Sequence, residues 1–286
     1  MVVLITGCGS GIGLDTALAF GRRGLLTYAT VRNPDAAGAL RLRVADEGLP
    51  VEVLRLDVTD DASVAAAVSQ VEKRHGAVGI LVNNAGVIST GPVETVPMDQ
   101  ARSLMETNFW GPVRLTRAVL PAMRARRRGV IVNINSLAGL VPGFMHSAFY
   151  AAGKHALSAM TESLAGEVAS FGVRALSIDL GPTGTRIHHG VGSSAENAGA
   201  YRADVRWAND FLVRSIESGN APAVVADEIV KTALDPDSPV HTAVGDTAAQ
   251  FIESARSAKT FEEWLAWAVP LAESVAGPRP STSAGD

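Results

Sequence analysis

Hydrophobic positions along the chain form seven short runs, separated by longer stretches of mixed polarity. Most of the runs are apolar at consecutive positions, which is typical of strands covered by helices on both faces. We predict strands at residues 2–6, 25–31, 51–56, 79–83, 130–135, 173–180 and 240–245. Their alternation with helical stretches predicts a parallel sheet built from βαβ units.

The stretches between these runs carry helical signals. In residues 60–75, Val64, Val68 and Val71 form one stripe, and Asp60 or Asp61 can cap the start. Further helices are predicted over 104–128 (one or two helices), 149–170 and 226–234. The whole pattern predicts a doubly wound α/β fold with a seven-stranded, mainly parallel sheet of order 3-2-1-4-5-6-7, which binds ligands at the carboxyl ends of its strands.

Two segments depart from this rhythm. Residues 184–222 mix Gly, Ser, His and aromatic residues, and we interpret them as a substrate lid. From about Thr247 onward, a helix bearing Trp264 and Trp267 is expected to pack on the domain or on a second subunit. Residues 277–286 are polar and are predicted to form a disordered tail. No linker divides the chain before residue 180, so residues 1–276 are predicted to form one domain.

Composition narrows the classes of function. The 286 residues include 47% hydrophobic and 19% charged residues, enough apolar mass for a sizeable core, and the net charge of −4 argues against nucleic acid as the main partner. A single cysteine, Cys8, excludes an intramolecular disulfide and a Cys-rich zinc site. The adjacent His188 and His189 diverge and have no acidic neighbour, so no metal site is expected. With no apolar stretch long enough to span a bilayer and no signal peptide, we predict a cytoplasmic protein.

A glycine-rich loop follows the first predicted strand. The segment Thr6-Gly-Cys-Gly-Ser-Gly-Ile-Gly-Leu14 fails the strict G-x-G-x-x-G spacing but fits T-G-x-x-x-G-I-G, and an amphipathic helical stretch follows it. Glycines allow the backbone to approach a diphosphate closely, and a helix N-terminus offers free N–H groups to it. We therefore predict a dinucleotide-binding loop whose contacts come from Gly7, Ser10, Gly11, Ile12 and Gly13.

Tyr150 and Lys154 are four residues apart in a predicted helix and therefore share one face. A free tyrosine has a pKa near 10, which makes it a poor acid/base group at neutral pH. An ammonium group beside the phenol favours the phenolate and lowers the pKa of the tyrosine. The pair therefore predicts an acid/base site, whereas the alternative is an ordinary surface pair on a helix.

Several motifs, taken together, resemble the short-chain dehydrogenase/reductase family, in its single-domain branch. They occur in family order over residues 1–185: the glycine loop, Asn83-Asn-Ala-Gly86, Asn108, Ser136 and Tyr150-x-x-x-Lys154. Residues 28–32 and 108–112 are similar to the steroid- and retinol-dehydrogenase-like branch. The resemblance implies a Rossmann-type domain that acts as an oxidoreductase on CH–OH or C=O groups with a nicotinamide cofactor.

The resemblance also implies roles for four residues. Tyr150 protonates the substrate carbonyl or takes the alcohol proton in reverse, and Lys154 lowers the pKa of Tyr150 and hydrogen-bonds the nicotinamide ribose. Ser136 binds the substrate oxygen, and Asn108 holds a water that links Lys154 to solvent. A strand-end turn for Ser136 and a helix cap for Asn108 remain alternatives. The chain departs from the family at Gly153, where serine is usual, and we expect close backbone approach to be the reason.

Further cofactor contacts follow from the ends of the other strands. Arg32 ends the second predicted strand where an acid would indicate NAD, so the sequence favours NADP(H), with NAD(H) still possible. By resemblance, the remaining cofactor contacts are Asp57, Val58, Asn83, Ala85, Gly86, Pro182, Thr183 and Thr185. The order Gly181-Pro182 reverses the usual Pro-Gly of the family, which changes the backbone contacts expected there.

The resulting hypothesis is hydride transfer between NADP(H) and a hydrophobic ketone or secondary alcohol, such as a bulky steroid, retinoid or polyketide, with Tyr150 as acid/base. Two alternatives are a 3-oxoacyl reductase of lipid or polyketide synthesis, which would use the same residues, and a non-enzymatic NADP-binding regulatory protein. The family usually self-associates, so a homodimer or homotetramer is expected through the helices at 100–128 and 149–170.

Overall fold

The computed structural model of the protein describes residues 1–187 and 195–280. Seven parallel strands form one sheet of order β3-β2-β1-β4-β5-β6-β7, which confirms the predicted fold class and strand order. The strands are β1 (Val3–Ile5), β2 (Thr27–Val31), β3 (Val51–Arg55), β4 (Ile80–Asn83), β5 (Gly129–Ser136), β6 (Val173–Leu180) and β7 (His241–Val244). Each lies within two residues of its predicted bounds, because buried apolar runs end where turn residues begin.

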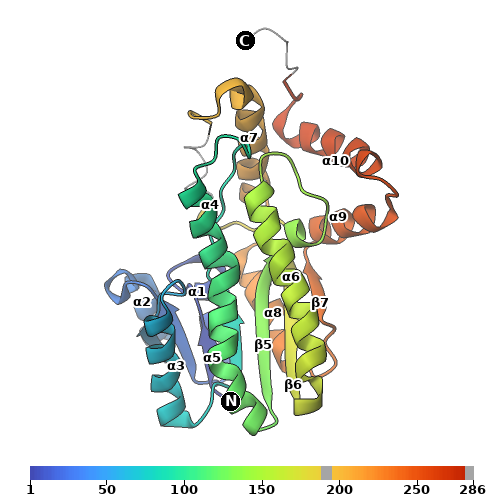
Figure 1. Ribbon diagram of the computed structural model, residues 1–286. Coiled ribbons are helices and arrows are strands. Elements are labelled where there is room, and N and C mark those ends of the chain that lie inside the picture. Colours follow the sequence, from blue (N-terminus) through green and yellow to red (C-terminus); the bar gives the residue numbers. More distant parts are fainter. Residues whose placement is uncertain (188–194, 281–286) are drawn as a thin grey trace.

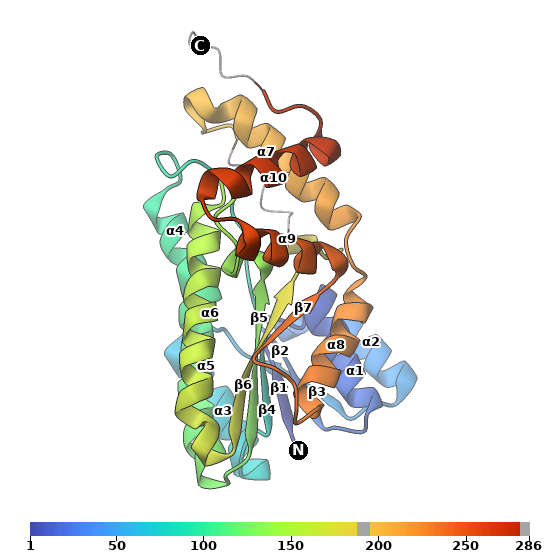
Figure 2. The ribbon, with the colours of Figure 1, turned by 90° about the vertical axis from the view of Figure 1, so that its right-hand side faces the viewer.

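Helices cover both faces of the sheet (Figure 2). One face carries α1 (Gly11–Arg22), α2 (Gly38–Glu47) and α8 (Pro222–Leu234), and the other carries α3 (Asp61–His75), α5 (Gly111–Ala125) and α6 (Ala148–Val168). Each layer encloses its own apolar core: Phe20, Ile178 and Ile229 lie in the first, and Leu81, Leu115 and Leu164 lie in the second. The sheet is therefore buried on both sides, as its sequence predicts.

A third group of helices lies beyond the carboxyl ends of the strands (Figure 1). It consists of α7 (Arg202–Glu217), α9 (Asp246–Ser257) and α10 (Phe261–Ala276), together with the short 3₁₀ turn Gly199–Tyr201. The side chain of Trp264 is 1% exposed and packs with Val141, Phe251 and Ile252. No described helix is both long and apolar enough to cross a bilayer.

Some elements differ from the sequence prediction. The segment predicted as 104–128 is two helices, α4 (Met98–Met105) and α5, joined by the π-helical segment Glu106–Trp110. Helices α2, α7 and α9 were not predicted, and α8 begins at Pro222, four residues earlier than expected. Short 3₁₀ helices occupy Pro34–Ala36, Leu137–Gly139 and Ala169–Phe171.

The predicted tail falls partly within the described residues. Arg279 makes a bidentate ion pair with Asp204 of α7, at 2.7 Å through each nitrogen, and the indole nitrogen of Trp207 donates to the Gly277 carbonyl at 2.7 Å. These bonds fasten residues 277–280 to the third group of helices, in contrast to the disorder that we expected for them. Residues 281–286 lie outside the described residues, as does the pair His188 and His189.

Candidate active site

The glycine loop connects β1 to the N-terminus of α1 and lies against the loop that follows β4. Gly7 has φ +75°, and a Cβ atom built there would lie 2.9 Å from the Ala85 Cα. A Cβ at Gly13 would lie 2.4 Å from both the Asn84 Nδ2 and the Gly7 carbonyl oxygen. Both positions therefore exclude any side chain. Because no side chains project from these glycines, an anion can approach the backbone N–H groups at the N-terminus of α1 closely.

The N-terminus of α1 has no side-chain cap. Ser10 occupies the N-cap position but makes no side-chain cap, and the first turn of α1 contains no acidic residue. The unpartnered N–H groups and the positive end of the helix dipole favour a negatively charged group there. Gly7, Ser10, Gly11, Ile12 and Gly13 therefore form a cradle that fits the diphosphate of a dinucleotide.

Thr6 and Asn84 lock this loop to β4. The Thr6 hydroxyl accepts hydrogen bonds from the backbone N–H groups of Asn84, at 3.0 Å, and Ala85, at 2.9 Å. The Asn84 amide nitrogen donates to the Thr6 carbonyl at 2.8 Å. Asn84 is a structural residue of the site that the sequence reasoning missed, although it lies inside the motif that marked Asn83, Ala85 and Gly86.

Asn83 itself points away from the loop. Its side chain is buried and donates to the Asn133 Oδ1 at 2.8 Å, and Asn133 in turn donates to the Thr161 hydroxyl at 2.8 Å. The side chain of Asn83 therefore fixes β4 to β5 and α6. A cofactor contact at this position would therefore have to come from the Asn83 backbone.

The structure brings Ser136, Tyr150 and Lys154 together. Ser136 ends β5, while Tyr150 and Lys154 lie one turn apart on α6, with the Lys154 Nζ 5.9 Å from the centroid of the Tyr150 ring. The Ser136 hydroxyl accepts a hydrogen bond from the Ala138 N–H at 3.2 Å and lines the same cavity as Tyr150. The Lys154 Nζ donates to the Ile134 carbonyl at 2.8 Å, which holds the ammonium group beneath the tyrosine. The arrangement brings two hydroxyl groups and one cation together near the carboxyl end of β5.

Burial controls the titration of this group of residues. It raises the pKa of Tyr150 above its ordinary value, and the hydrogen bond from Ser136 opposes the rise only in part. Burial also lowers the pKa of Lys154 to about 8, while the charge of Asp179 acts in the opposite direction. The pKa of Tyr150 is therefore raised, whereas the lysine alone would lower it. Removing the phenolate from water destabilises it by more than the neighbouring groups stabilise it.

Asn108 lies in the π-helical segment between α4 and α5 and is 1% exposed. Its side chain clamps the backbone of Val87 from both sides: the Nδ2 donates to the Val87 carbonyl at 2.8 Å, and the Oδ1 accepts from the Val87 N–H at 2.9 Å. Both polar atoms of the side chain thus have a partner, and the side chain is not a helix cap. Extra residues of this π type often mark functional sites.

Gly153 packs against the same segment, but without close approach. A Cβ there would lie 3.4 Å from the Met105 sulfur and 3.8 Å from the Asn108 Cβ, which are ordinary contacts. Our expectation that close backbone approach requires this glycine is therefore wrong. A side chain as small as alanine fits at this position.

The residues expected to choose the cofactor lie at the ends of β2 and β3. Arg32 is exposed just beyond β2, and its charge helps to lower the pKa of Asp57, after the larger effect of the hydrogen bond from the Thr59 N–H. Asp57 also accepts from the Thr59 hydroxyl at 2.8 Å. Val58 is buried, and a Cβ at Gly111 would lie 2.9 Å from it.

Residues 181–185 lie over the glycine loop. A Cβ at Gly11 would lie 3.3 Å from the Thr185 methyl group, so Thr185 lies directly beside the start of α1. Thr183 is buried and its hydroxyl donates to the Gly181 carbonyl at 3.1 Å. The Asn220 backbone N–H donates to the Pro182 carbonyl at 2.9 Å, so the chain after α7 fixes this turn in place. No local sequence pattern marks Asn220 as part of the site.

A cavity of about 360 Å³ opens beside Ser136 and Tyr150. Its walls are mainly apolar, and no Asp, Glu, Lys, Arg or His occurs among the described residues that line it. Much of the wall comes from the third group of helices. Ala208, Phe211 and Leu212 belong to the segment that we interpreted as a substrate lid, whereas the sequence reasoning missed the contributions of Phe251, Trp264, Leu271 and Val275. Phe144 and Met145, which we expected near the pocket, also line it.

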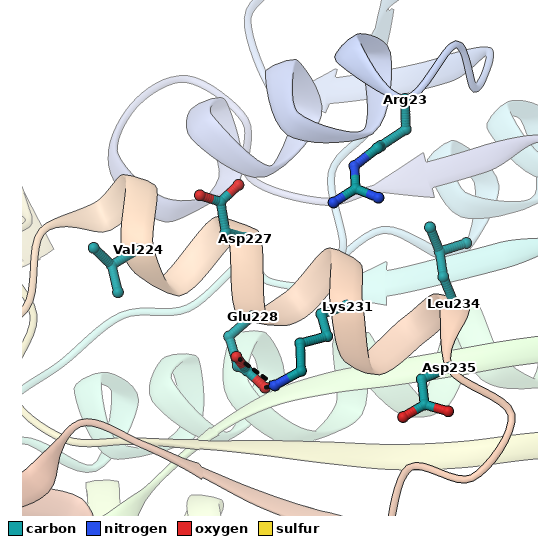
Figure 3. A pocket seen from close by; sticks show the side chains of 7 residues that line it. All are labelled: Arg23, Val224, Asp227, Glu228, Lys231, Leu234 and Asp235. Atoms are coloured by element: carbon teal, nitrogen blue, oxygen red, sulfur yellow. Dashed lines mark hydrogen bonds and ion pairs between the residues drawn. The ribbon is translucent and has the colours of Figure 1, made fainter.

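A more open depression of about 680 Å³ lies elsewhere, along α8 (Figure 3). It is lined by charged side chains that include Arg23 and Asp227, and by Lys231, which is paired with Glu228 at 3.0 Å. Arg23 follows the far end of α1, whose 12 residues place it about 18 Å from the glycine loop. Despite its larger volume, this depression contains none of the groups described above.

Comparisons with known proteins agree with this geometry. The family model for short chain dehydrogenases matches residues 1–196. Retinol dehydrogenase 8 of Bos taurus is 36% identical over 241 residues, which are 80% of this chain and 76% of that protein. A short-chain dehydrogenase from Streptomyces avermitilis has a TM-score of 0.74 at 33% identity, covering 88% of this chain and 90% of that one. A metagenomic short-chain oxidoreductase in complex with NADP has a TM-score of 0.68 at 28% identity, covering 85% and 96%.

The glycine cradle, the open start of α1 and the Ser136, Tyr150 and Lys154 cluster therefore occur on a fold that this chain shares with solved short-chain dehydrogenases. The cradle fits the diphosphate of the nicotinamide cofactor bound by such neighbours. The chain belongs to the short-chain dehydrogenase/reductase family of oxidoreductases.

Proposed function

We propose that the protein transfers a hydride between NADP(H) and a hydrophobic ketone or secondary alcohol, with Tyr150 as the acid/base. The observation that carries the proposal is the cavity beside Ser136 and Tyr150, whose mainly apolar wall includes no charged side chain among the described residues and reaches the hydroxyl groups of these two residues. An uncharged and mainly apolar wall disfavours small charged acids, because their charges would lose solvent without gaining a counter-charge. A largely apolar molecule that carries one reactive oxygen suits it.

The cofactor, when bound, supplies or accepts the hydride. Each remaining role belongs to residues of this chain. Tyr150 gives its phenolic proton to the carbonyl oxygen as negative charge develops there, and Ser136 donates a hydrogen bond to the same oxygen. Lys154 stabilises the phenolate left on Tyr150, and Asn108 holds the segment at Val87 beside them. In the reverse direction, Tyr150 takes the proton of the alcohol.

Arg32 supports the choice of NADP(H) over NAD(H). It lies exposed at the end of β2, and no carboxylate follows it until Asp35, which lies in the 3₁₀ turn beyond Pro34. A guanidinium group at this position suits a 2′-phosphate, whereas a carboxylate would bind the free ribose hydroxyls. The remaining cofactor contacts that we propose are Asp57, Val58, Ala85, Gly86, Pro182, Thr183 and Thr185.

Similarity to retinol dehydrogenase 8 supports a bulky apolar substrate of the retinoid or steroid kind. A panel of aromatic, terpenoid and steroid ketones should be reduced with NADPH, read by loss of the reduced-nicotinamide absorbance. Charged 2-oxo acids of similar reactivity serve as the matched control and should react at least a hundredfold more slowly. Preferential turnover of the charged acids would refute the proposal, and a preference for 3-oxoacyl thioesters would favour the reductase of lipid or polyketide synthesis.

Self-association and cellular location are two further expectations for this protein. We propose that copies of the chain associate through the helices at 100–128 and 149–170, where Trp110 is 46% exposed beside the site. Light scattering on the purified protein tests this association. A cytoplasmic location remains a prediction.

A further inference from the structure

A layer of polar side chains lies between the sheet and α6, the helix that carries Tyr150 and Lys154. Strand register aligns Asn133 of β5 with Ser177 of β6, and Ser177 with His241 of β7. Two residues further along, Asn135 is aligned with Asp179. Because side chains alternate between faces along a strand, these residues all share the face covered by α6. Polar side chains in such a layer need partners, since they are removed from water.

Asp179 is the one carboxylate in this layer, and it is 0% exposed. It accepts a hydrogen bond from the Ser177 hydroxyl at 2.7 Å and contacts the His241 Nδ1 at 2.9 Å. The other ring nitrogen of His241 lies 3.0 Å from a carboxylate oxygen of Glu162, an exposed residue of α6. Asp179 is thus the inner end of a chain of contacts that runs through His241 to the surface at the β7 edge of the sheet.

The same layer places Asp179 near Lys154. The Lys154 ammonium donates to the Ile134 carbonyl at 2.8 Å, and the next residue of β5, Asn135, is paired with Asp179 on a neighbouring strand about 4.8 Å away. Asn135 itself lies close under α6. A Cβ built at Gly139 would lie 2.8 Å from the Asn135 Oδ1 and 2.7 Å from the Lys154 carbonyl, so these groups surround one small volume.

A buried ammonium is costly unless an opposite charge lies nearby. Lys154 is 6% exposed, and its only hydrogen bond described here goes to a neutral carbonyl. The titratable groups around it are Tyr150 and Glu162 on α6, Asp179 on β6 and His241 on β7. Of these, Glu162 is exposed, so Asp179 is the buried negative charge. The direction in which Asp179 moves the pKa of Lys154, upward, agrees with this position.

We infer that Asp179, oriented by Ser177 and His241, is the counter-charge that keeps Lys154 protonated. It is a positioning residue: it touches neither the substrate cavity nor the tyrosine, and it acts through the lysine. The inference rests on the proposed function only for its consequence in catalysis, because Lys154 must carry its charge to stabilise the Tyr150 phenolate. The charge state of Lys154 can be measured without any turnover.

The test follows the titration of Lys154 by NMR. The chain contains four lysines, Lys73, Lys154, Lys231 and Lys259, so lysine labelled with ¹³C at Cε gives four signals, and Lys154→Met assigns the buried one. In Asp179→Asn, the midpoint of Lys154 should fall by about one pH unit or more, a tenfold change in its proton affinity. Ser177→Ala is the matched control: it removes one hydrogen bond of Asp179 but leaves the charge, and it should leave the midpoint within about 0.3 unit.

An unchanged Lys154 midpoint in Asp179→Asn overturns the inference, whether or not the protein reduces ketones. A stability comparison covers the case in which this variant folds poorly. Because each single change leaves one buried charge without its partner, the double variant Lys154→Met/Asp179→Asn should regain at least part of the urea midpoint that Asp179→Asn loses. A double variant that regains none of it also overturns the inference.

Discussion

Alanine at Gly13 tests whether the glycine loop is shaped by steric exclusion. The new Cβ would lie 2.4 Å from both the Asn84 Nδ2 and the Gly7 carbonyl oxygen, about 1 Å inside ordinary contact. The Asn84 amide would have to leave its bonds to the Thr6 carbonyl at 2.8 Å and the Gly7 carbonyl at 3.2 Å. Two lost hydrogen bonds at about 1 kcal/mol each, with about 1–3 kcal/mol for overpacking, give a cost of roughly 3–5 kcal/mol.

The gain in helix propensity from alanine, about 1 kcal/mol, offsets only part of that cost. We therefore expect the free energy of unfolding to fall by roughly 2–4 kcal/mol and NADPH to bind at least tenfold more weakly, because the moved loop no longer admits the diphosphate. Urea unfolding followed by circular dichroism and titration of nicotinamide fluorescence measure the two effects.

Gly166→Ala is the control for this change. Gly166 also lies inside a helix, α6, but a Cβ there meets nothing within 4 Å, so the same substitution should stabilise the protein by about 1 kcal/mol and leave NADPH binding unchanged. If Gly13→Ala were as stable as the parent protein and bound NADPH equally well, the steric account of the loop would be refuted.

Three further changes test other parts of the site. Arg32→Asp should lower the preference for NADPH over NADH by about 10–100-fold, because the 2′-phosphate loses a charge-assisted bond and meets a like charge. The preference is measured as the ratio of the two kcat/KM values, and an unchanged ratio would exclude Arg32 from cofactor choice. The pKa of Lys154 is lowered to about 8, so kcat/KM for ketone reduction should be constant below that pH. Above it, kcat/KM should fall about tenfold per pH unit as the ammonium is lost, and a profile that stays flat to pH 10 would contradict this. Bonds from Arg279 and His146 lower the pKa of Asp204, so the stability that this carboxylate contributes is present above pH 4 and declines on acidification. Asp204→Asn should therefore lower the urea midpoint more at pH 7 than at pH 3, and an equal loss at both values would argue against the ion pair.

Much of the fold could be predicted because its strands are buried on both faces. Strand β6 (Val173–Leu180) was predicted at its observed bounds, since a run of apolar residues between turn residues leaves few alternatives. Helix α2 was not predicted because Leu40 is its one buried residue, so its sequence carries no stripe of apolar residues at helical spacing. Helix α7 does carry one, with Val205, Ala208 and Ile216 on its buried side, and that period was hidden among the polar residues of the predicted lid.

The candidate site could be predicted where a local motif carries it and not where distant segments meet. The glycine loop and the Tyr150 and Lys154 pair are read from spacing alone. The Asn108 side chain binds the backbone of Val87, which lies 21 residues away in the sequence. Asp179 contacts His241, which lies 62 residues away. No local pattern specifies such contacts, because they arise from strand register and from the π-helical turn.

The central claim is that Tyr150 moves the proton in hydride transfer to a hydrophobic ketone. The most direct measurement is single-turnover oxidation of NADPH by Tyr150→Phe with a ketone that the parent protein reduces, alongside NADPH affinity. The account predicts a rate at least a hundredfold below that of the parent, with the affinity for NADPH changed less than about threefold. A variant that reduces the ketone at the parental rate would contradict it.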